Sequence, residues 1–401
     1  MTAFRTRGHP AAVAAVAAML RSHVPHAILL VGPHGVGKAT LAADIAAGLL
    51  CTDPDVAERP CGQCRACRLV ASGGHPDVHR LGPDGAGRQV VIGGPGSPAR
   101  GVRDLIVDLS LRAVEGGYRV AIVSDAHRMN EDAQAALLKT LEEPADGVAI
   151  VLCADVEDPI LPTIRSRSAR FRLGPVATRD VEAVLVEAGA ADPALAARLA
   201  RITGGRPGLA MAWAAHPEAM LAREQLARTL LDLADARPSA RLEAIRAAIP
   251  LAASVAAIED EPPARATPVP SARGRSRPAG PTAPSTPATP RDEATDSDDG
   301  EGEAAAPVRA SAAARRRATE AIIMVWTDIA RDLLVIARGL PAAARDIALL
   351  DETGAAAAGH DPTRLLAFLE RLGRATTLLA GNVSPELILD DLVLAWPAAR
   401  P

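Results

Sequence analysis

Aromatic residues are scarce in this 401-residue chain, which contains three tryptophans, three phenylalanines and one tyrosine. A core with so few rings must be built from small aliphatic side chains, and the abundant alanine favours helices. The chain also lacks an uninterrupted apolar run of the roughly 18 to 20 residues that spans a bilayer, and it shows no N-terminal secretory pattern. We therefore expect a cytoplasmic protein with no membrane partner.

An excess of charge of one sign is also missing, because 44 basic residues face 48 acidic ones and the net charge is -4. A chain that bound nucleic acid by itself over a wide surface would usually be basic. The balance therefore favours protein partners, with any nucleic-acid contact local or shared. The length predicts two or three domains rather than one core.

Cysteines are few, but four of the five follow one another at the spacing C-x9-C-x2-C-x2-C. Thiols three residues apart on a tight turn can converge on one tetrahedral metal ion. The sequence therefore predicts a structural zinc site, and a cytoplasmic setting would keep its thiols reduced. A loop of free or redox-active thiols is the alternative. The fifth cysteine, Cys153, follows an apolar run and should be an inert core residue. The expected zinc ligands are Cys51, Cys61, Cys64 and Cys67.

Residues 1–174 alternate short apolar runs with helical patterns, which is typical of a parallel sheet flanked by helices. Three continuous aliphatic runs, at 27–31, 119–124 and 148–153, read as strands buried on both faces. Between the last two we expect a helix that begins at the N-cap Asn130 and ends at Pro144. The fold class predicted for this part is α/β.

The rest of the chain reads as helical. Residues 175–215 are expected to form a small helical lid, interrupted by a glycine-rich turn at 204–208. Amphipathic stretches at 221–233, 240–253, 318–336 and 385–396 predict an all-α domain made of residues 216–257 and 312–401.

A Pro- and Ala-rich segment at 258–311 divides that helical domain, and we expect it to be disordered because it has almost no large apolar residue. Its acidic block lies between two arginine blocks, so a self-neutralising linker is the main interpretation. A nucleic-acid tether made of the arginines is the alternative.

A glycine-rich segment at 32–40, GPHGVGKAT, follows the first expected strand and opens a helix, which is the setting of a phosphate-binding loop. Glycines let backbone N–H groups turn inward, and the lysine can reach terminal phosphates. The position that normally coordinates Mg²⁺ is Ala39, and Thr40 lies about 100° further round the helix. A glycine turn that only joins strand to helix is the alternative. The candidate nucleotide-binding residues are Gly32, Gly35, Gly37, Lys38 and Thr40.

Asp125 ends the second expected strand, where a Walker B aspartate would hold the metal ion. The next position should supply a glutamate that polarises the attacking water, and it is Ala126. Loss of a positioned general base lowers a rate by about 10² to 10⁴. The sequence therefore predicts a site that could bind ATP and Mg²⁺ but would hydrolyse ATP slowly or not at all.

Together with the glycine loop and the cysteines, three motifs resemble the bacterial clamp-loader branch of the AAA+ ATPases. They are Asp125-x-His127, LLKTLEEP at 137–144 and LPTIRSR at 161–167. This branch comprises the gamma/tau motor subunits and the delta-prime subunit of DNA polymerase III. The resemblance covers residues 1 to about 215 and, more weakly, 318–396. It implies a RecA-like AAA+ module with a zinc insertion, a helical lid, and a helical collar that assembles a ring.

The resemblance also implies that Arg167 is an arginine finger acting in trans on ATP held by a neighbouring motor subunit. The residue after it is Ser168 where the family motif usually has cysteine. His127 is interpreted as a structural residue at the strand end. Asp155 stands near the position of a polar sensor, where an acid would repel a γ-phosphate.

These departures favour the non-hydrolysing delta-prime type, a component of the DNA polymerase III holoenzyme rather than an independent enzyme. The partners implied are the gamma/tau and delta subunits and, through the complex, the sliding clamp and primer-template DNA. One alternative is an ATP-hydrolysing gamma/tau-like motor or another AAA+ ATPase of DNA metabolism. Another is a zinc-dependent nucleic-acid binder that uses the arginine blocks of 258–311.

Overall fold

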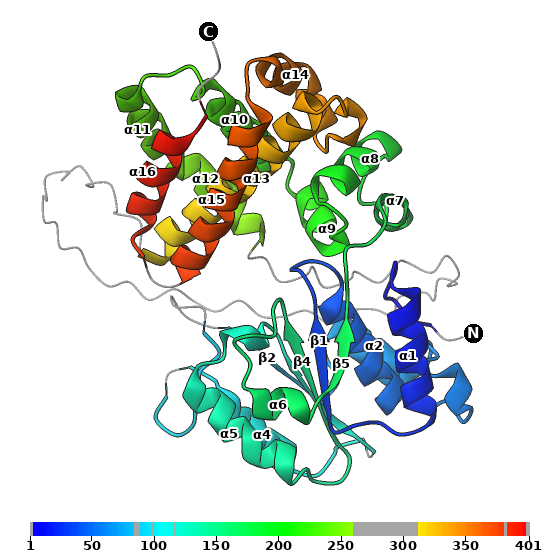
Figure 1. The fold of residues 1–401 in the computed structure, drawn as a ribbon. Helices are drawn as coiled ribbons and strands as arrows, with labels where there is room; N and C mark the ends of the chain where they lie inside the picture. Colours follow the sequence, from blue (N-terminus) through cyan, green and yellow to red (C-terminus); the bar gives the residue numbers. More distant parts are fainter. Residues whose placement is uncertain are drawn as a thin grey trace, which may run out of the picture.

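A computed structural model describes residues 3–83, 89–97, 99–115, 117–259, 312–380 and 383–397. Figure 1 shows an α/β body at one end of the molecule and an all-helical region at the other, with helices α7 to α9 between them. The disorder predicted for 258–311 concerns a segment that lies almost wholly outside the described residues. No helix in the described ranges is long and apolar enough to cross a membrane.

The α/β body is built on a five-stranded sheet in the order β2-β3-β4-β1-β5. All its strand pairs are parallel, which confirms the predicted sheet type. The central strands lie where the aliphatic runs predicted them, whereas two short edge strands with charged residues were not predicted. The strands are β1 (Ala27–Val31), β2 (Val78–Leu81), β3 (Arg119–Val123), β4 (Val148–Ala154) and β5 (Ala169–Arg172).

Helices cover both faces of the sheet, and alternate residues of β1 enter two separate cores. Ile28 and Leu30 pack with α1 and α2, whereas Ala27 and Leu29 belong to the core that includes α4 and α5. The Asn130 side chain accepts a hydrogen bond from the N–H of Ala133, so it is the N-cap predicted for α5. The helices are α1 (Pro10–Arg21), α2 (Lys38–Leu50), α3 (Arg65–Ser72), α4 (Val102–Ser110), α5 (Glu131–Glu142) and α6 (Pro162–Ser166).

Residues beyond the sheet are helical, as predicted. The stretch expected as one helix at 240–253 is two, because Pro250 lacks an N–H and suits the first turn of a new helix. The helices are α7 (Thr178–Glu187), α8 (Pro193–Ile202), α9 (Pro207–Ala215), α10 (Pro217–Asp232), α11 (Pro238–Ala247), α12 (Ile249–Glu259), α13 (Ala312–Ala337), α14 (Leu350–Ala358), α15 (Pro362–Ala380) and α16 (Pro385–Ala395).

Helices α12 and α13 flank residues 260–311 in the sequence, and they pack against each other. Both flanks of that segment therefore lie in one helical region. Its core gathers three of the chain's few aromatic rings: Phe368 packs edge-on against Trp326 and Trp396, with centroids 5.3 and 4.8 Å away. Edge-to-face packing adds to the apolar burial that joins α13, α15 and the end of α16.

Candidate functional site

The glycine loop runs from the end of β1 to the start of α2, where the sequence predicted it. Gly35 and Gly37 have φ of 74° and 113°, a left-handed conformation that other residues adopt only with strain. A side chain at Gly32 would collide with the backbone just beyond β5, because its Cβ would lie 2.1 Å from the carbonyl oxygen of Leu173. Glycine is therefore required at these three positions for the loop to follow this course.

Lys38 begins α2, and the hydrogen-bond donors of its ammonium group are all directed at protein oxygens. Nζ donates to the carbonyl oxygens of Gly32 and Pro33, at 2.6 and 2.9 Å, and to Oδ1 of Asp155 at 2.7 Å. The side chain is only 8% exposed. A lysine has three N–H donors, so these three acceptors satisfy all of them. Thr40 lies half-buried in the first turn of α2.

Asp125, His127 and Asp155 gather at the carboxyl ends of β3 and β4, with one ligand-type atom of each within 4.8 Å of the others. Asp125 has a φ of 49°, which aspartate tolerates better than most residues. His127 Nδ1 accepts a hydrogen bond from the N–H of Asp155 at 3.2 Å, and burial lowers the pKa of its imidazole. Ala126 is fully buried where an ATPase would present its glutamate.

The first turn of α9 lies directly on the glycine loop. The N–H of Gly208 donates to the carbonyl oxygen of Gly35 at 2.7 Å, and a Cβ on Gly35 would lie 2.9 Å from the nitrogen of Leu209. On another side, His9 Nε2 lies 2.9 Å from the carbonyl oxygen of Val36. Helix α9 and the N-terminal segment thus hold the loop from outside the sheet.

Arg167 follows α6 on the surface, and its side chain is 38% exposed. One guanidinium nitrogen lies 3.1 Å from Oε1 of Glu142, the last residue of α5, and another donates to the carbonyl oxygen of Thr163 at 3.1 Å. The two sequence motifs 137–144 and 161–167 therefore meet through this ion pair.

Gln134 also links α5 to the motif 161–167, and the sequence analysis did not single it out. Its amide nitrogen donates to the carbonyl oxygens of Met129 and Pro159, at 3.1 and 3.0 Å, and its amide oxygen accepts from the N–H of Leu161 at 2.8 Å. The side chain is buried in the turn that leads to α6. A signal was present, because Gln134 falls one helical turn before Leu137, on the apolar side of α5.

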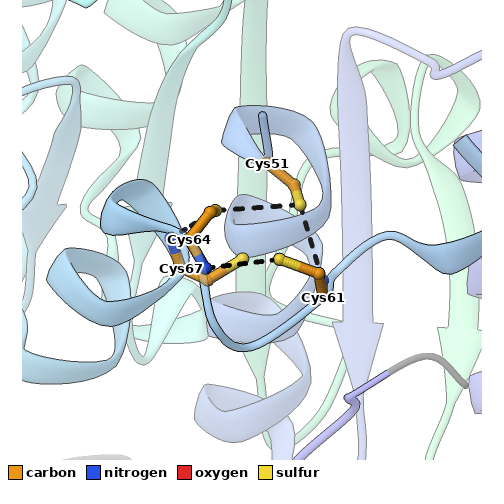
Figure 2. A group of neighbouring side chains, drawn as sticks. All are labelled: Cys51, Cys61, Cys64 and Cys67. Carbon is orange, nitrogen blue, oxygen red and sulfur yellow. Dashed lines mark hydrogen bonds between the residues drawn. The ribbon is translucent and has the colours of Figure 1, made fainter. Parts of the chain in front are cut away.

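The four predicted zinc ligands converge on one point beside the sheet (Figure 2). They come from the end of α2, the following loop and the first turns of α3, and one sulfur of each lies within 4.8 Å of the other three. Cys51 Sγ and Cys64 Sγ are 3.9 Å apart. Four sulfurs at about 2.3 Å from a tetrahedral zinc ion would be about 3.8 Å apart, so the donor set fits this metal.

Backbone N–H groups point at these sulfurs. Those of Cys61, Cys64 and Cys67 donate to the Sγ of Cys51, Cys61 and Cys64, at 3.5, 3.4 and 3.4 Å. Burial opposes ionisation of Cys64, but hydrogen bonds from Cys67 and Thr52 outweigh it and lower its pKa to about 6. Burial raises the pKa of Cys51 and Cys67. Neutral pH alone would not ionise all four thiols, whereas a bound cation would.

Cys153 lies away from this cluster. It is 3% exposed within β4, and burial raises its pKa to about 12. An un-ionised, inaccessible thiol is unreactive, which confirms the prediction of a core cysteine.

A parallel sheet in which an inner strand, β1, leads into a glycine loop at the start of a helix is the arrangement typical of P-loop nucleotide-binding proteins. The comparisons with known proteins are more specific. Residues 8–177 match the protein-family model described as "DNA polymerase III, delta subunit".

Curated relatives are delta' and tau/gamma subunits of DNA polymerase III. The chain is 41% identical over 147 residues to DNA polymerase III subunit delta' of Pseudomonas aeruginosa, covering 37% of this chain and 42% of that one. It is 33% identical over 188 residues to the delta' subunit of Escherichia coli K12, covering 47% and 54%. DNA polymerase III subunit tau/gamma of Haemophilus influenzae is 32% identical over 148 residues, covering 37% and 20%.

Solved structures also match. One is the RuvB Holliday junction branch migration motor of Thermotoga maritima, with a TM-score of 0.36 and 18% identity, covering 54% of this chain and 63% of that chain. Another is a DNA polymerase III gamma subunit-related protein of the same organism, with a TM-score of 0.35 and 14% identity, covering 95% and 97%.

The family resemblance expected from the motifs is thereby confirmed: the N-terminal part of the chain is related to delta' subunits and to gamma/tau. The matches span about half the length of the delta' relatives. Identity does not separate the two subunit types, since delta' of Bacillus subtilis is 30% identical and tau of E. coli is 32% identical.

Proposed function

We propose that this chain is a non-hydrolysing, delta'-type subunit of a clamp-loader complex that places a sliding clamp on primed DNA during replication. The observation that carries the proposal is the state of Lys38, whose three donors are all taken by protein oxygens. A lysine held in this way has no N–H free for a terminal phosphate.

Two alanines support the same conclusion. Ala39 replaces the hydroxyl residue that coordinates Mg²⁺, and Ala126 replaces the glutamate that would polarise water. Each replacement removes a catalytic group and leaves the fold intact. ATP and Mg²⁺ at this loop therefore have no catalytic role in the proposal.

Arg167 is proposed to act in trans, on ATP bound by a gamma/tau-type neighbour. A planar guanidinium that is always charged suits the stabilisation of a developing phosphate charge. Its partner Glu142 is also exposed, and exposed ion pairs are worth about 0–1 kcal/mol. Exchange of this carboxylate for a phosphate at an interface would therefore cost little.

The remaining parts have structural roles in the proposal. Zinc held by the four cysteines supplies a cross-link between α2 and α3, and with four thiolate ligands it has no open position for chemistry. Residues 1–174 form the AAA+ module, 175–215 the lid, and 216–257 with 312–401 the collar that joins the gamma/tau and delta subunits. Contacts with the clamp and primer-template DNA are made through the complex.

Turnover by the purified chain tests the proposal against its alternative, a gamma/tau-like motor. With ATP and Mg²⁺, we expect no hydrolysis above background, and no change on Lys38→Ala. Lys139→Ala is the matched control, because Lys139 lies on the exposed side of α5. Hydrolysis that Lys38→Ala abolishes and Lys139→Ala preserves would show that the chain is itself a motor.

A further inference from the structure

We propose that Asp155 is a built-in anion that takes the place of a nucleotide phosphate on Lys38 and so keeps the glycine loop closed to nucleoside triphosphates. This inference rests on the proposed function and explains why the subunit would not bind a nucleoside triphosphate. It attributes the loss of nucleotide binding to one carboxylate and not to a changed conformation of the loop.

The strand order brings this carboxylate to the loop. β4 pairs with β1 so that Ala154 lies opposite Val31, and the N–H of Gly32 donates to the carbonyl oxygen of Ala154 at 3.1 Å. Asp155 is the next residue after β4, so its side chain emerges where the loop begins. The pairing of two buried strands thus sets the position of the acid, although Asp155 itself is 28% exposed on its side chain.

Asp155 is also held from its backbone. Its N–H donates to Nδ1 of His127 at 3.2 Å, and Oδ1 accepts from Lys38 Nζ at 2.7 Å. A phosphate at the same ammonium group would have to displace this oxygen. It would then meet the freed carboxylate and the nearby Asp125 at short range, where like charges repel strongly.

The rest of the cradle remains suited to an anion. Gly35 and Gly37 keep their left-handed conformations, and α2 begins at Lys38 with its positive helix end toward the loop. The lysine of the loop is not free, because its three donors are taken by protein oxygens. Removal of the Asp155 charge should therefore uncover a binding site for the polyphosphate of a nucleotide. Hydrolysis should not follow, because Ala39 and Ala126 still provide no metal ligand and no base.

Titration of the full-length chain with a fluorescent ATP analogue in Mg²⁺ tests the inference. We expect the wild type to show no saturable binding at submillimolar analogue and Asp155→Asn to bind at least about tenfold more tightly. Asp158→Asn is the matched control, since it removes the same charge from the same segment at an exposed position. Lys38→Ala added to Asp155→Asn should abolish the gain. Competition by tripolyphosphate would show that the phosphates, and not the base, are recognised.

Thermal unfolding of each variant separates loss of binding from loss of the fold. A folded Asp155→Asn variant that binds no better than the wild type would overturn the inference and leave the non-hydrolysing function untouched. Tight binding by the wild type would also overturn it. ATP turnover by the wild type would instead overturn the proposed function, so the two failures are distinguishable.

Discussion

At the scale of single residues, Gln134 shows how a buried polar group determines the course of the chain around the site. Its three hydrogen bonds join the start of α5 to the turn before α6, from which Arg167 follows. It is 3% exposed, so water cannot replace a lost partner.

Replacement of Gln134 by leucine keeps the volume and removes the hydrogen bonds. The buried carbonyl oxygen of Met129 and the half-buried N–H of Leu161 lose their partner, so we expect the free energy of unfolding to fall by about 1–3 kcal/mol. Urea unfolding measures it. Gln225→Leu, at an exposed position of α10, should change stability by less than about 0.5 kcal/mol. Equal effects of the two variants would contradict the role given to Gln134.

Residues also show where sequence reasoning stops. The glycine loop and the departures at Ala39, Ala126 and Asp155 could all be read from the sequence. The ion pair between Lys38 and Asp155 could not, because it joins residues 117 positions apart and depends on the pairing of β1 with β4. Asp155 was expected to repel a phosphate. In the structure its carboxylate also accepts a hydrogen bond from Lys38 Nζ.

At the scale of elements, the predictable strands were those buried on both faces. β1, β3 and β4 are continuous aliphatic runs, whereas β2 reads VHRL and β5 reads ARFR. A short edge strand with one covered face carries charged side chains, and nothing in its pattern separates it from a loop. The apolar periodicity predicted that helices form here. It did not predict the break between α11 and α12, which is set by Pro250 in the first turn of α12.

The cysteine module is the clearest test at this scale. The wild-type chain should bind one zinc ion, and Cys64→Ser should lower its zinc content and melting temperature, because one of the four thiolate ligands is lost. Metal analysis of the purified protein measures the first effect, and chelator treatment should reproduce the second. Cys153→Ser, in β4, should retain the metal. Full zinc content in Cys64→Ser would contradict the four-thiolate site.

At the scale of the whole molecule, a buried ion-pair network joins elements that are far apart in the sequence. Arg223 of α10 is 4% exposed and contacts Asp346 at 2.6 Å and Asp328 of α13 at 3.1 Å. Arg198 of α8 lies 2.6 Å from Glu224 and 3.6 Å from Asp346. The network therefore links the proposed lid to the helical region, and no local sequence pattern could have predicted it.

Arg223→Met should be strongly destabilising, since Asp346 and Asp328 lose their closest counter-charge in a low-exposure site. They keep only the more distant Arg198 and Arg345. Loss of one partner of a buried pair costs about 3–5 kcal/mol. Arg246→Met, which breaks an exposed pair with Asp390, should cost no more than about 1 kcal/mol. Denaturant unfolding compares the two variants. A small loss for Arg223→Met would mean that the network does not hold these helices together.

In the proposed function, the molecule acts on a nucleotide that a neighbouring subunit holds. The measurement that tests this claim most directly is the DNA- and clamp-stimulated ATPase rate of a complex reconstituted with the gamma/tau and delta subunits. Arg167→Ala should leave assembly intact and lower that rate at least about tenfold, whereas Arg170→Ala, at an exposed position of β5, should leave it unchanged. An intact complex with an unchanged rate in Arg167→Ala would contradict the account.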